Sequence, residues 1–326
     1  MRKFPTAVAA AMAALAAAGT GPARAAVTKA VYVAGVTAPA GALWLKDRTP
    51  AGGHLWVADH VAGLCRLDPA DATGATAALD PDSCLLIGQP GQPAYDPATG
   101  TVYLPDLSSH SRGVSRVPFD PAAGLLAKAA AGLIPASFPL GPYRPLAVAV
   151  DSLGQAYASF KRTGAVYRLT GPRGAAIDAA VPAAGSSDGG PVASLAAVGR
   201  DLYLAEAAAV TVVDLGGDLF PGDAPCGQPC VARDAGFGIL GPLSLAYDGR
   251  YLYAGDVTTL HRVDPASGAK ATYATGFANL SGVAVSQRTV DAATLAVTPR
   301  KVFAGDDPTA GAAVGLGRWY RMNRKP

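Results

Sequence analysis

Two histidines lie behind matching aspartates in the N-terminal part of the sequence, in a pattern that could hold a divalent metal. His60 directly follows Asp59, and His110 lies shortly after Asp106. Imidazole nitrogens and carboxylates are common ligands of divalent metals. The four residues could share one metal if the two segments occupy equivalent turns of adjacent repeats. No short His-x-His pair supports such a site. We therefore predict no cofactor and keep a divalent metal as the alternative.

Further polar residues lie where strand connections are expected to open on one face of the fold, which we call the top face. Residues that differ from repeat to repeat are the better binding candidates, because recurring acidic residues commonly cap turns by accepting backbone N–H groups. The recurring set is Asp59, Asp106, Glu206, Asp256 and Asp306. The predicted ligand-binding set is His60, His110, Tyr143, Arg144, Lys161, Asp188 and Asn279, with Gln92 at an equivalent position.

A sixfold repeat shows which elements position these residues. Its copies, an alternation of apolar and aromatic residues that mostly ends in an acid, are His54–Asp59, Thr101–Asp106, Gln155–Phe160, Asp201–Glu206, Tyr251–Asp256 and Lys301–Asp306. A run of small apolar residues precedes most copies, and a run containing a basic residue follows. A period of about 50 residues is typical of β-propellers. The pattern predicts strands a, b and c of each blade, with a more variable strand d.

The two ends of the sequence predict how the ring closes. Gly317–Met322 reads as strand c of the last blade, and Ala30–Ala34 can supply its strand d. Such pairing removes open sheet edges. We therefore predict an all-β, six-bladed β-propeller closed by an N-terminal strand that completes the last blade. An open β-solenoid is the alternative. In the long connection after blade two, Ala122–Ala131 is predicted as a short helix.

The repeat resembles those of the NHL-repeat and SMP-30/gluconolactonase-like six-bladed propellers, of which this sequence reads as an exported bacterial member. The resemblance rests on the six motif cores and on endings such as Arg66–Pro69. It implies a metal at the channel mouth, held by carboxylates and an amide. The expected Glu is absent from Thr37–Trp44, and the expected Asp is absent between Ser281 and Gly282. The resemblance therefore specifies the fold better than the activity.

The N-terminus reads as an export signal. Basic residues Arg2 and Lys3 precede the apolar run Ala7–Ala18, and small residues mark a cleavage site after Ala25. The run is shorter than the ~20 residues of a membrane span. We predict a signal peptide over residues 1–25, one propeller domain over residues 26–326, and a periplasmic or secreted protein with no membrane span after cleavage. An uncleaved anchor is the alternative.

The charge balance excludes one class of partner. The sequence has 27 basic and 24 acidic residues, and the predicted signal holds three basic residues and no acidic one. The remaining chain is therefore neutral and has no basic cluster, which argues against nucleic-acid binding. The sequence also lacks a phosphate-binding loop and a calcium loop.

The four cysteines predict disulfides, because an even number in an exported chain is normally paired. Cys65 and Cys84 fall within blade one and are predicted to join neighbouring strands. Cys226 and Cys230 lie in a loop rich in Pro and Gly and are predicted to form a small-loop disulfide. A copper or thiol-redox site at this second pair is the alternative.

These observations favour a non-enzymatic function. An intact repeat scaffold without the expected metal ligands predicts a propeller that binds an envelope partner protein or a small polar ligand through its top face. The first alternative is a divergent metal-dependent hydrolase, lactonase or lyase of the SMP-30-like type. The second alternative is an envelope redox or copper-associated protein.

Overall fold

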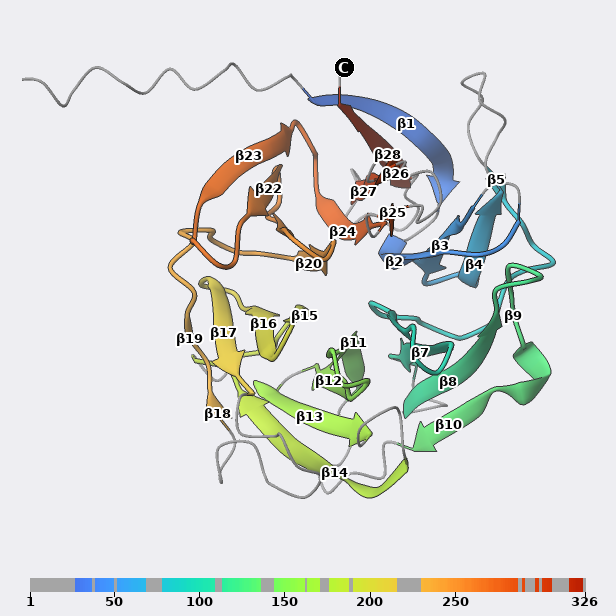
Figure 1. Cartoon of the computed structure of the whole chain (residues 1–326), viewed down its shortest axis with the longest axis horizontal. Coiled ribbons are helices and arrows are strands. Elements are labelled where there is room, and N and C mark those ends of the chain that lie inside the picture. Colours follow the sequence, from blue (N-terminus) through green and yellow to red (C-terminus); the bar gives the residue numbers. More distant parts are fainter. Residues whose placement is uncertain are drawn as a thin grey trace, which may run out of the picture.

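The protein is an all-β propeller, as the sequence predicts (Figure 1). The computed structural model describes residues 27–36, 39–49, 52–68, 78–108, 113–135, 144–161, 163–170, 176–187, 190–215, 230–286, 289–290, 297–298, 301–306 and 317–324. Within these ranges, six sheets have four or five strands and one has two. No helix in these ranges is long and apolar enough to cross a membrane.

The first strand of each larger sheet lies nearest the centre (Figure 1). These strands are β2 (Pro39–Leu45), β6 (Ala94–Asp96), β11 (Pro145–Val150), β15 (Ser194–Val198), β20 (Ser244–Tyr247) and β24 (Leu280–Val285). The second strands contain the repeated motif. They are β3 (His54–Asp59), β7 (Thr101–Asp106), β12 (Ala156–Phe160), β16 (Asp201–Ala205), β21 (Leu252–Gly255) and β27 (Val302–Asp306).

The third and outer strands complete the sheets. The third strands are β4 (Gly63–Asp68), β8 (Gly113–Asp120), β13 (Ala165–Thr170), β17 (Val210–Asp214), β22 (Thr259–Val263) and β28 (Gly317–Arg324). The outer strands are β5 (Ala78–Leu79), β10 (Gly132–Pro135), β14 (Ala176–Gly185), β19 (Arg233–Asp234), β23 (Lys270–Thr275) and β1 (Val27–Val36). Short additions are β9 (Leu125–Leu126), β18 (Cys230–Val231) and the pair β25 (Thr289–Val290) and β26 (Val297–Thr298).

The motif strands are buried on both faces because each sheet packs between two others. Every residue of β3 and β7 is buried. Trp56 of β3 packs with Val102 of β7 and Phe119 of β8, so one apolar cluster joins the first two sheets. The alternating apolar residues of each motif therefore fill the space between blades on both sides.

The sheet formed by β24, β27 and β28 takes its outer strand from the other end of the described chain. β1 pairs antiparallel with β28, with Val31 opposite Tyr320 and Val33 opposite Trp319. β28 in turn pairs with β27. The segment at the N-terminal end of the described residues is thus hydrogen-bonded to the segment at the C-terminal end.

The predicted helix over Ala122–Ala131 is wrong. Residues 121–124 form a turn, β9 pairs with the end of β8, and only one three-residue 3₁₀ turn, η1 (Lys128–Ala130), follows. Gly124 has a φ of 64°, in the left-handed region that ends a helix. Buried Leu126 packs into the cluster between the first two sheets, which holds the segment as a strand.

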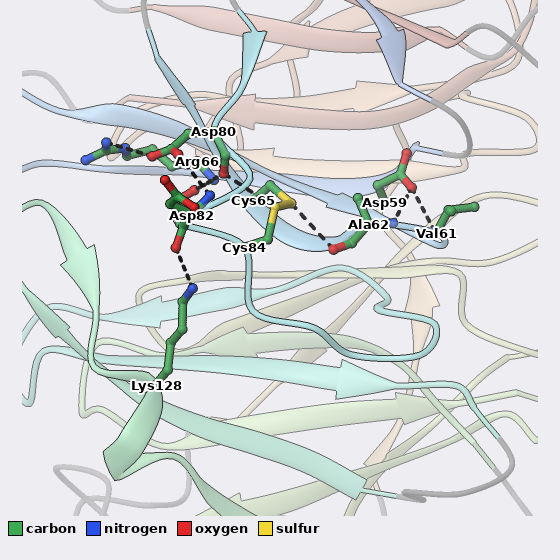
Figure 2. The surroundings of a disulfide bond; sticks show 10 residues. Asp59, Val61, Ala62, Cys65, Arg66, Asp80, Asp82, Cys84 and Lys128 are labelled. Atoms are coloured by element: carbon green, nitrogen blue, oxygen red, sulfur yellow. Dashed lines mark hydrogen bonds and ion pairs between the residues drawn. A yellow bond between two sulfur atoms is a disulfide. The ribbon is translucent and has the colours of Figure 1, made fainter.

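The predicted disulfide between Cys65 and Cys84 is present, with Cα atoms 4.1 Å apart (Figure 2). Cys65 lies in β4, but Cys84 lies after β5 rather than in the outer strand. The following residue, Leu85, pairs with Leu64 of β4. The disulfide therefore fixes this returning segment against β4. Cys226 lies outside the described residues, so the pairing of Cys226 with Cys230 stays a prediction.

Candidate functional site

A cavity of about 770 Å³ lies on the central axis of the ring. One alanine from the first strand of each larger sheet contributes to its wall: Ala42, Ala94, Ala149, Ala196, Ala246 and Ala284. Short side chains at the centre leave a space that larger residues would fill. The volume lies within the range of small-molecule sites. We call this cavity the central chamber.

The side chain of Gln92, just before β6, closes the inner end of the chamber. Its Nε2 donates hydrogen bonds to the carbonyl oxygens of Leu195 (3.3 Å) and Leu245 (3.0 Å) across the axis. Its backbone pairs with β11, where the Gln92 N–H donates a hydrogen bond to the carbonyl oxygen of Leu146 (2.9 Å). A Cβ atom on the preceding Gly91 would overlap with that same carbonyl oxygen of Leu146. Glycine therefore allows the Gln92 segment to approach β11.

Two buried serines extend this closure around the ring. The Ser194 hydroxyl donates to the Gln92 Oε1 and accepts a hydrogen bond from the Leu245 N–H (2.8 Å). The Ser244 hydroxyl accepts from the N–H of Val283 (2.9 Å). Side-chain hydrogen bonds thus join the first strands of neighbouring sheets at this end. We call the network of Gln92, Ser194 and Ser244 the polar closure.

The opposite end of the chamber opens at the turns between first and second strands. Exposed residues that line it there are Lys46, Arg48, Gly52, Pro97 and Pro121. Half-buried aromatic and polar residues lie deeper and include Trp44, Tyr95, Tyr247 and Lys301. We call these nine residues the mouth. The Lys301 ammonium lies 4.3 Å from the centre of the Trp44 ring, and Trp44 stacks on buried Phe303.

Asp47 is the acidic residue of the chamber lining, but its carboxylate is engaged in holding the turn. Its Oδ2 lies 2.5 Å from Nδ1 of buried His54. Its Oδ1 accepts hydrogen bonds from the backbone N–H and the hydroxyl of Thr49. The three cationic side chains of the mouth therefore face the chamber opening without a free carboxylate among the lining residues.

Tyr95 adds a neutral donor to the chamber. Burial raises the pKa of its phenol, and the neighbouring Asp96 carboxylate raises that pKa further. The phenol therefore keeps its proton through the physiological pH range and can donate a hydrogen bond. Its ring packs edge-on against Phe119 of β8.

Gln92, which was placed beside the predicted ligand-binding set, lines the chamber, whereas His60, Arg144, Lys161 and Asn279 lie at the other end of the strands and do not line it. His60 and Lys161 interact electrostatically, and the Lys161 N–H donates to the Arg144 carbonyl (2.7 Å). These three residues therefore come together on the top face. Asn279 lies between the fifth and last sheets. His110, Tyr143 and Asp188 lie outside the described residues, so a binding role for the whole set stays a prediction.

His60 is exposed at the turn between β3 and β4. Partial desolvation lowers the pKa of its imidazole, the Asp59 carboxylate opposes this, and the Lys161 charge lowers the pKa further. The His60 imidazole therefore loses its proton at a lower pH than a free imidazole does.

Three of the recurring acidic residues, Asp59, Asp106 and Asp256, cap turns as predicted. Asp59 accepts the N–H groups of Val61 and Ala62, at 2.7 and 2.9 Å, and Asp106 accepts that of Ser108 at 2.7 Å (Figure 2 shows Asp59). Asp256 caps its own turn in the same way. Glu206 and Asp306 instead accept backbone N–H groups from other connections, Glu206 from Ser187 and Asp306 from Ala278 and Asn279. Asp256 also bonds to His261 (3.0 Å). Burial raises the Asp256 pKa, but these hydrogen bonds outweigh it, and the net pKa is lowered.

A metal site is not assembled from the described residues, which contain no group of three His, Cys, Asp or Glu side chains placed to hold a metal. The candidates Asp59 and Asp106 use carboxylate oxygens for turn N–H groups, and His110 lies outside the described residues. At the position where the resemblance implies an aspartate, Ser281 begins the inner strand β24 together with Leu280 and Gly282.

The chamber mouth was missed in the sequence. The runs of small apolar residues that precede the motif copies do not by themselves indicate a cavity. The available signal was the contrast between those small residues and the large or cationic residues at the turns that follow them, such as Trp44, Lys46 and Arg48. The turns between first and second strands were not considered as a binding face.

The comparisons with known proteins identify the fold. No protein family model matches the chain, and no curated protein is similar to it in sequence. Among solved structures, the PQQ-bound aldose sugar dehydrogenase of Streptomyces coelicolor is 16% identical, with a TM-score of 0.58 over 93% of this chain and 99% of that chain. A gluconolactonase of Xanthomonas campestris is 16% identical, with a TM-score of 0.57 over 91% of this chain and 89% of that one. A luciferin-regenerating enzyme is 11% identical, with a TM-score of 0.60 over 92% and 95%.

The similarity to these neighbours confirms the β-propeller fold predicted from the repeat. At sequence identities of 16% or less, similarity to these structures is evidence for a shared fold and not for a shared activity. The NHL-repeat assignment and bacterial export stay predictions. The Cys65–Cys84 disulfide is in keeping with an oxidising, exported environment.

Proposed function

We propose that the protein binds a small polar organic molecule in the central chamber. The observation that carries the proposal is a cavity of about 770 Å³ that is closed by Gln92 at one end and lined by exposed residues at the other. Concave sites of this size, with a few polar groups on a largely apolar wall, are typical of small-molecule sites. A flat top-face interface for a partner protein has no comparable support.

The chamber wall also offers backbone hydrogen bonds. Each first strand is the terminal strand of its sheet, so one edge of its backbone is directed toward the axis. The carbonyls of Leu195 and Leu245 use that edge to bind the amide of Gln92. Nearer the mouth, the same edges are available to hydroxyl or amide groups of a ligand.

The enzymatic alternative is a hydrolase of sugar-derived lactones, and it is favoured by the structural neighbours, which are named as gluconolactonase, sugar dehydrogenase and luciferin-regenerating enzyme. In this alternative the top-face residues His60, Arg144 and Lys161 would act on the substrate. A metal, if the reaction requires one, would need ligands from beyond the described residues. The redox alternative depends on Cys226 and stays a prediction.

We also propose that the propeller has six blades and that the N-terminal strand closes its ring. The six larger sheets support six blades, and the pairing of β1 with β28 supports closure by the N-terminal strand. We further propose that residues 26–326 form a single domain and that residues 1–25 are an export signal. Their test is the N-terminal sequence of the protein recovered from the producing cells, which should begin near Ala26.

The chamber proposal is tested by intrinsic fluorescence. Trp44 lines the chamber, whereas Trp56 is fully buried between sheets. A ligand that enters the chamber should change the emission of the wild type but not of the Trp44→Phe variant. A panel of polyols, sugar acids and lactones is titrated against both proteins. Binding that leaves the Trp44 signal unchanged would place the site elsewhere.

The enzymatic alternative is tested separately on purified protein. Hydrolysis of glucono-lactone is measured above the spontaneous rate, with and without a chelator, followed by the His60→Ala variant. Loss of hydrolysis on chelation and in His60→Ala would support the metal-dependent hydrolase. A rate equal to the spontaneous rate would contradict it.

A further inference from the structure

The charges around the chamber are distributed unevenly. The described lining residues include three cations, Lys46, Arg48 and Lys301, and one acid, Asp47. The sequence as a whole is close to balanced, with 27 basic and 24 acidic residues. An excess of one sign at a concave opening focuses the field there and attracts ions of the opposite sign. The mouth therefore differs from the average surface of this protein.

The one acid offsets at most one of the three cationic charges, and its oxygens are not available to pair with the mouth cations directly. Asp47 is 6% exposed, and both of its carboxylate oxygens bond within the turn, to His54 and to Thr49. Asp47 could contact the mouth cations only by breaking these hydrogen bonds, which would require the turn to unfold locally. The carboxylate is thus a structural group, and the cationic character of the opening is built into the fold.

Lys301 is held in position before any ligand arrives. Its backbone N–H donates to the Ser286 hydroxyl (2.8 Å), and its carbonyl accepts the Ser286 N–H (2.9 Å). Its ammonium lies over the face of Trp44 at 4.3 Å, and Trp44 is in turn stacked on Phe303 with ring centres 5.5 Å apart. A positioned cation on an aromatic platform loses less conformational entropy on binding than a free lysine does.

Arg48 is fixed through its backbone as well. Its N–H donates to the carbonyl of Pro121 in the turn of the neighbouring sheet (2.7 Å). Both residues line the chamber. The second cation therefore comes from a turn attached to two sheets, and its exposed guanidinium can pair with a carboxylate through two hydrogen bonds.

We propose that the mouth recognises a small organic anion, a carboxylate whose charged group lies among Lys46, Arg48 and Lys301 while its body occupies the alanine-lined chamber. This rests on the proposed chamber function and adds the charge class of its ligand. Tyr95 is a further neutral donor within the same cavity. The site is at the opposite end of the strands from the residues predicted on the top face.

Matched pairs of probes test the proposal. Gluconate is compared with glucitol, and benzoate with benzyl alcohol, because the two members of each pair have similar size and differ in charge. Affinities are measured by Trp44 fluorescence at low and at physiological ionic strength. We expect at least one carboxylate to bind about tenfold more tightly than its neutral partner, which corresponds to one charge-assisted hydrogen bond. We also expect added salt to weaken the binding of the carboxylate.

Variants assign the effect to the mouth. Lys301→Gln should weaken binding of the carboxylate about tenfold and change binding of its neutral partner little. Lys301→Arg should retain most of the affinity for the carboxylate. Lys46→Gln and Arg48→Gln should each weaken binding of the carboxylate by about two- to fivefold, because these side chains are exposed. Lys270→Gln is the matched control, since Lys270 is an exposed lysine bonded to the Gly238 carbonyl outside the chamber. Melting curves of each variant check that the fold is intact.

The outcomes separate the two proposals. Equal affinity for the charged and neutral members of both pairs would overturn the anion inference and leave the chamber function standing. A preference for carboxylates that persists in the combined Lys46→Gln, Arg48→Gln and Lys301→Gln variant would also overturn it. Failure of all four probes to change the Trp44 signal would overturn both proposals.

Discussion

The two ends of the central axis use the same six inner strands in opposite ways. At the closed end, Gln92, Ser194 and Ser244 connect strands of neighbouring sheets through hydrogen bonds. At the open end, alanines leave a chamber, and charged and aromatic residues surround its opening. Under the chamber proposal, the closed end stabilises the ring and the open end binds the ligand.

Loss of the Gln92 side chain should have the largest effect on stability. Gln92→Ala removes two hydrogen bonds to strand carbonyls and one from the Ser194 hydroxyl, and we expect the free energy of unfolding to fall by about 2–3 kcal/mol. Chemical denaturation measures this change. The matched control is Gln89→Ala, since the Gln89 side chain is exposed nearby, and it should change stability by less than about 0.5 kcal/mol. Equal effects of the two substitutions would refute the polar closure.

Ser194→Ala should follow, with a loss of about 2 kcal/mol, because the Leu245 N–H is left without its buried acceptor. Ser244→Ala removes one such bond, to Val283, and should cost about 1 kcal/mol. Exposed Ser152 serves as the control position.

The double variant of Gln92→Ala with Ser194→Ala should lose less than the sum of the two single variants, because the pair shares a hydrogen bond. Strict additivity in a double-mutant cycle would show that the two residues act independently.

A smaller effect is expected from pH on the top face. The folded state lowers the pKa of His60 below its ordinary value of 6.5, so the unfolded chain binds the proton first as the pH falls. This contribution to stability is present in full above pH 6.5 and is lost as the pH falls through the lower pKa of the folded state. His60→Gln should therefore flatten the dependence of the melting temperature on pH below 6.5. An unchanged pH profile would contradict the assigned direction.

The smallest change in stability is expected at the mouth. Lys46 is exposed and no partner fixes its ammonium in the described contacts, so Lys46→Gln should alter the free energy of unfolding by less than about 0.5 kcal/mol. Thermal melting without ligand measures it. A loss as large as that of Ser194→Ala would mean that the open end also stabilises the ring.

The strand pattern could be predicted from sequence because it depends on local periodicity. The six motif segments form the second strands, and the alternation of apolar and aromatic residues in His54–Asp59 reflects packing between sheets. The turn-capping acids and the Cys65–Cys84 pair were predictable for the same reason, since each acts within one repeat or between adjacent ones. Leu126 shows the limit of local reasoning, because its long-range packing against other strands overrides the helix preference of its alanine-rich segment.

The site could not be predicted in the same way. Gln92 contacts Leu195 and Leu245, which lie far away in the sequence, and its role appears only when several sheets meet at the axis. The chamber likewise arises from one alanine of each sheet, and a single alanine in a single repeat gives no signal. Convergence of distant residues at a symmetry axis has no counterpart in local sequence patterns.

The pairing of β1 with β28 has a consequence for the order of folding. Val27 lies opposite Arg324, so this pairing cannot form until the chain has been synthesised as far as Arg324. Contacts between such distant segments are slow to form, because a long loop must close before they give any stabilisation. The sheets between them can each assemble from neighbouring segments. The pairing of β1 with β28 is therefore expected to be a late step of folding, and the ring stays open until it forms.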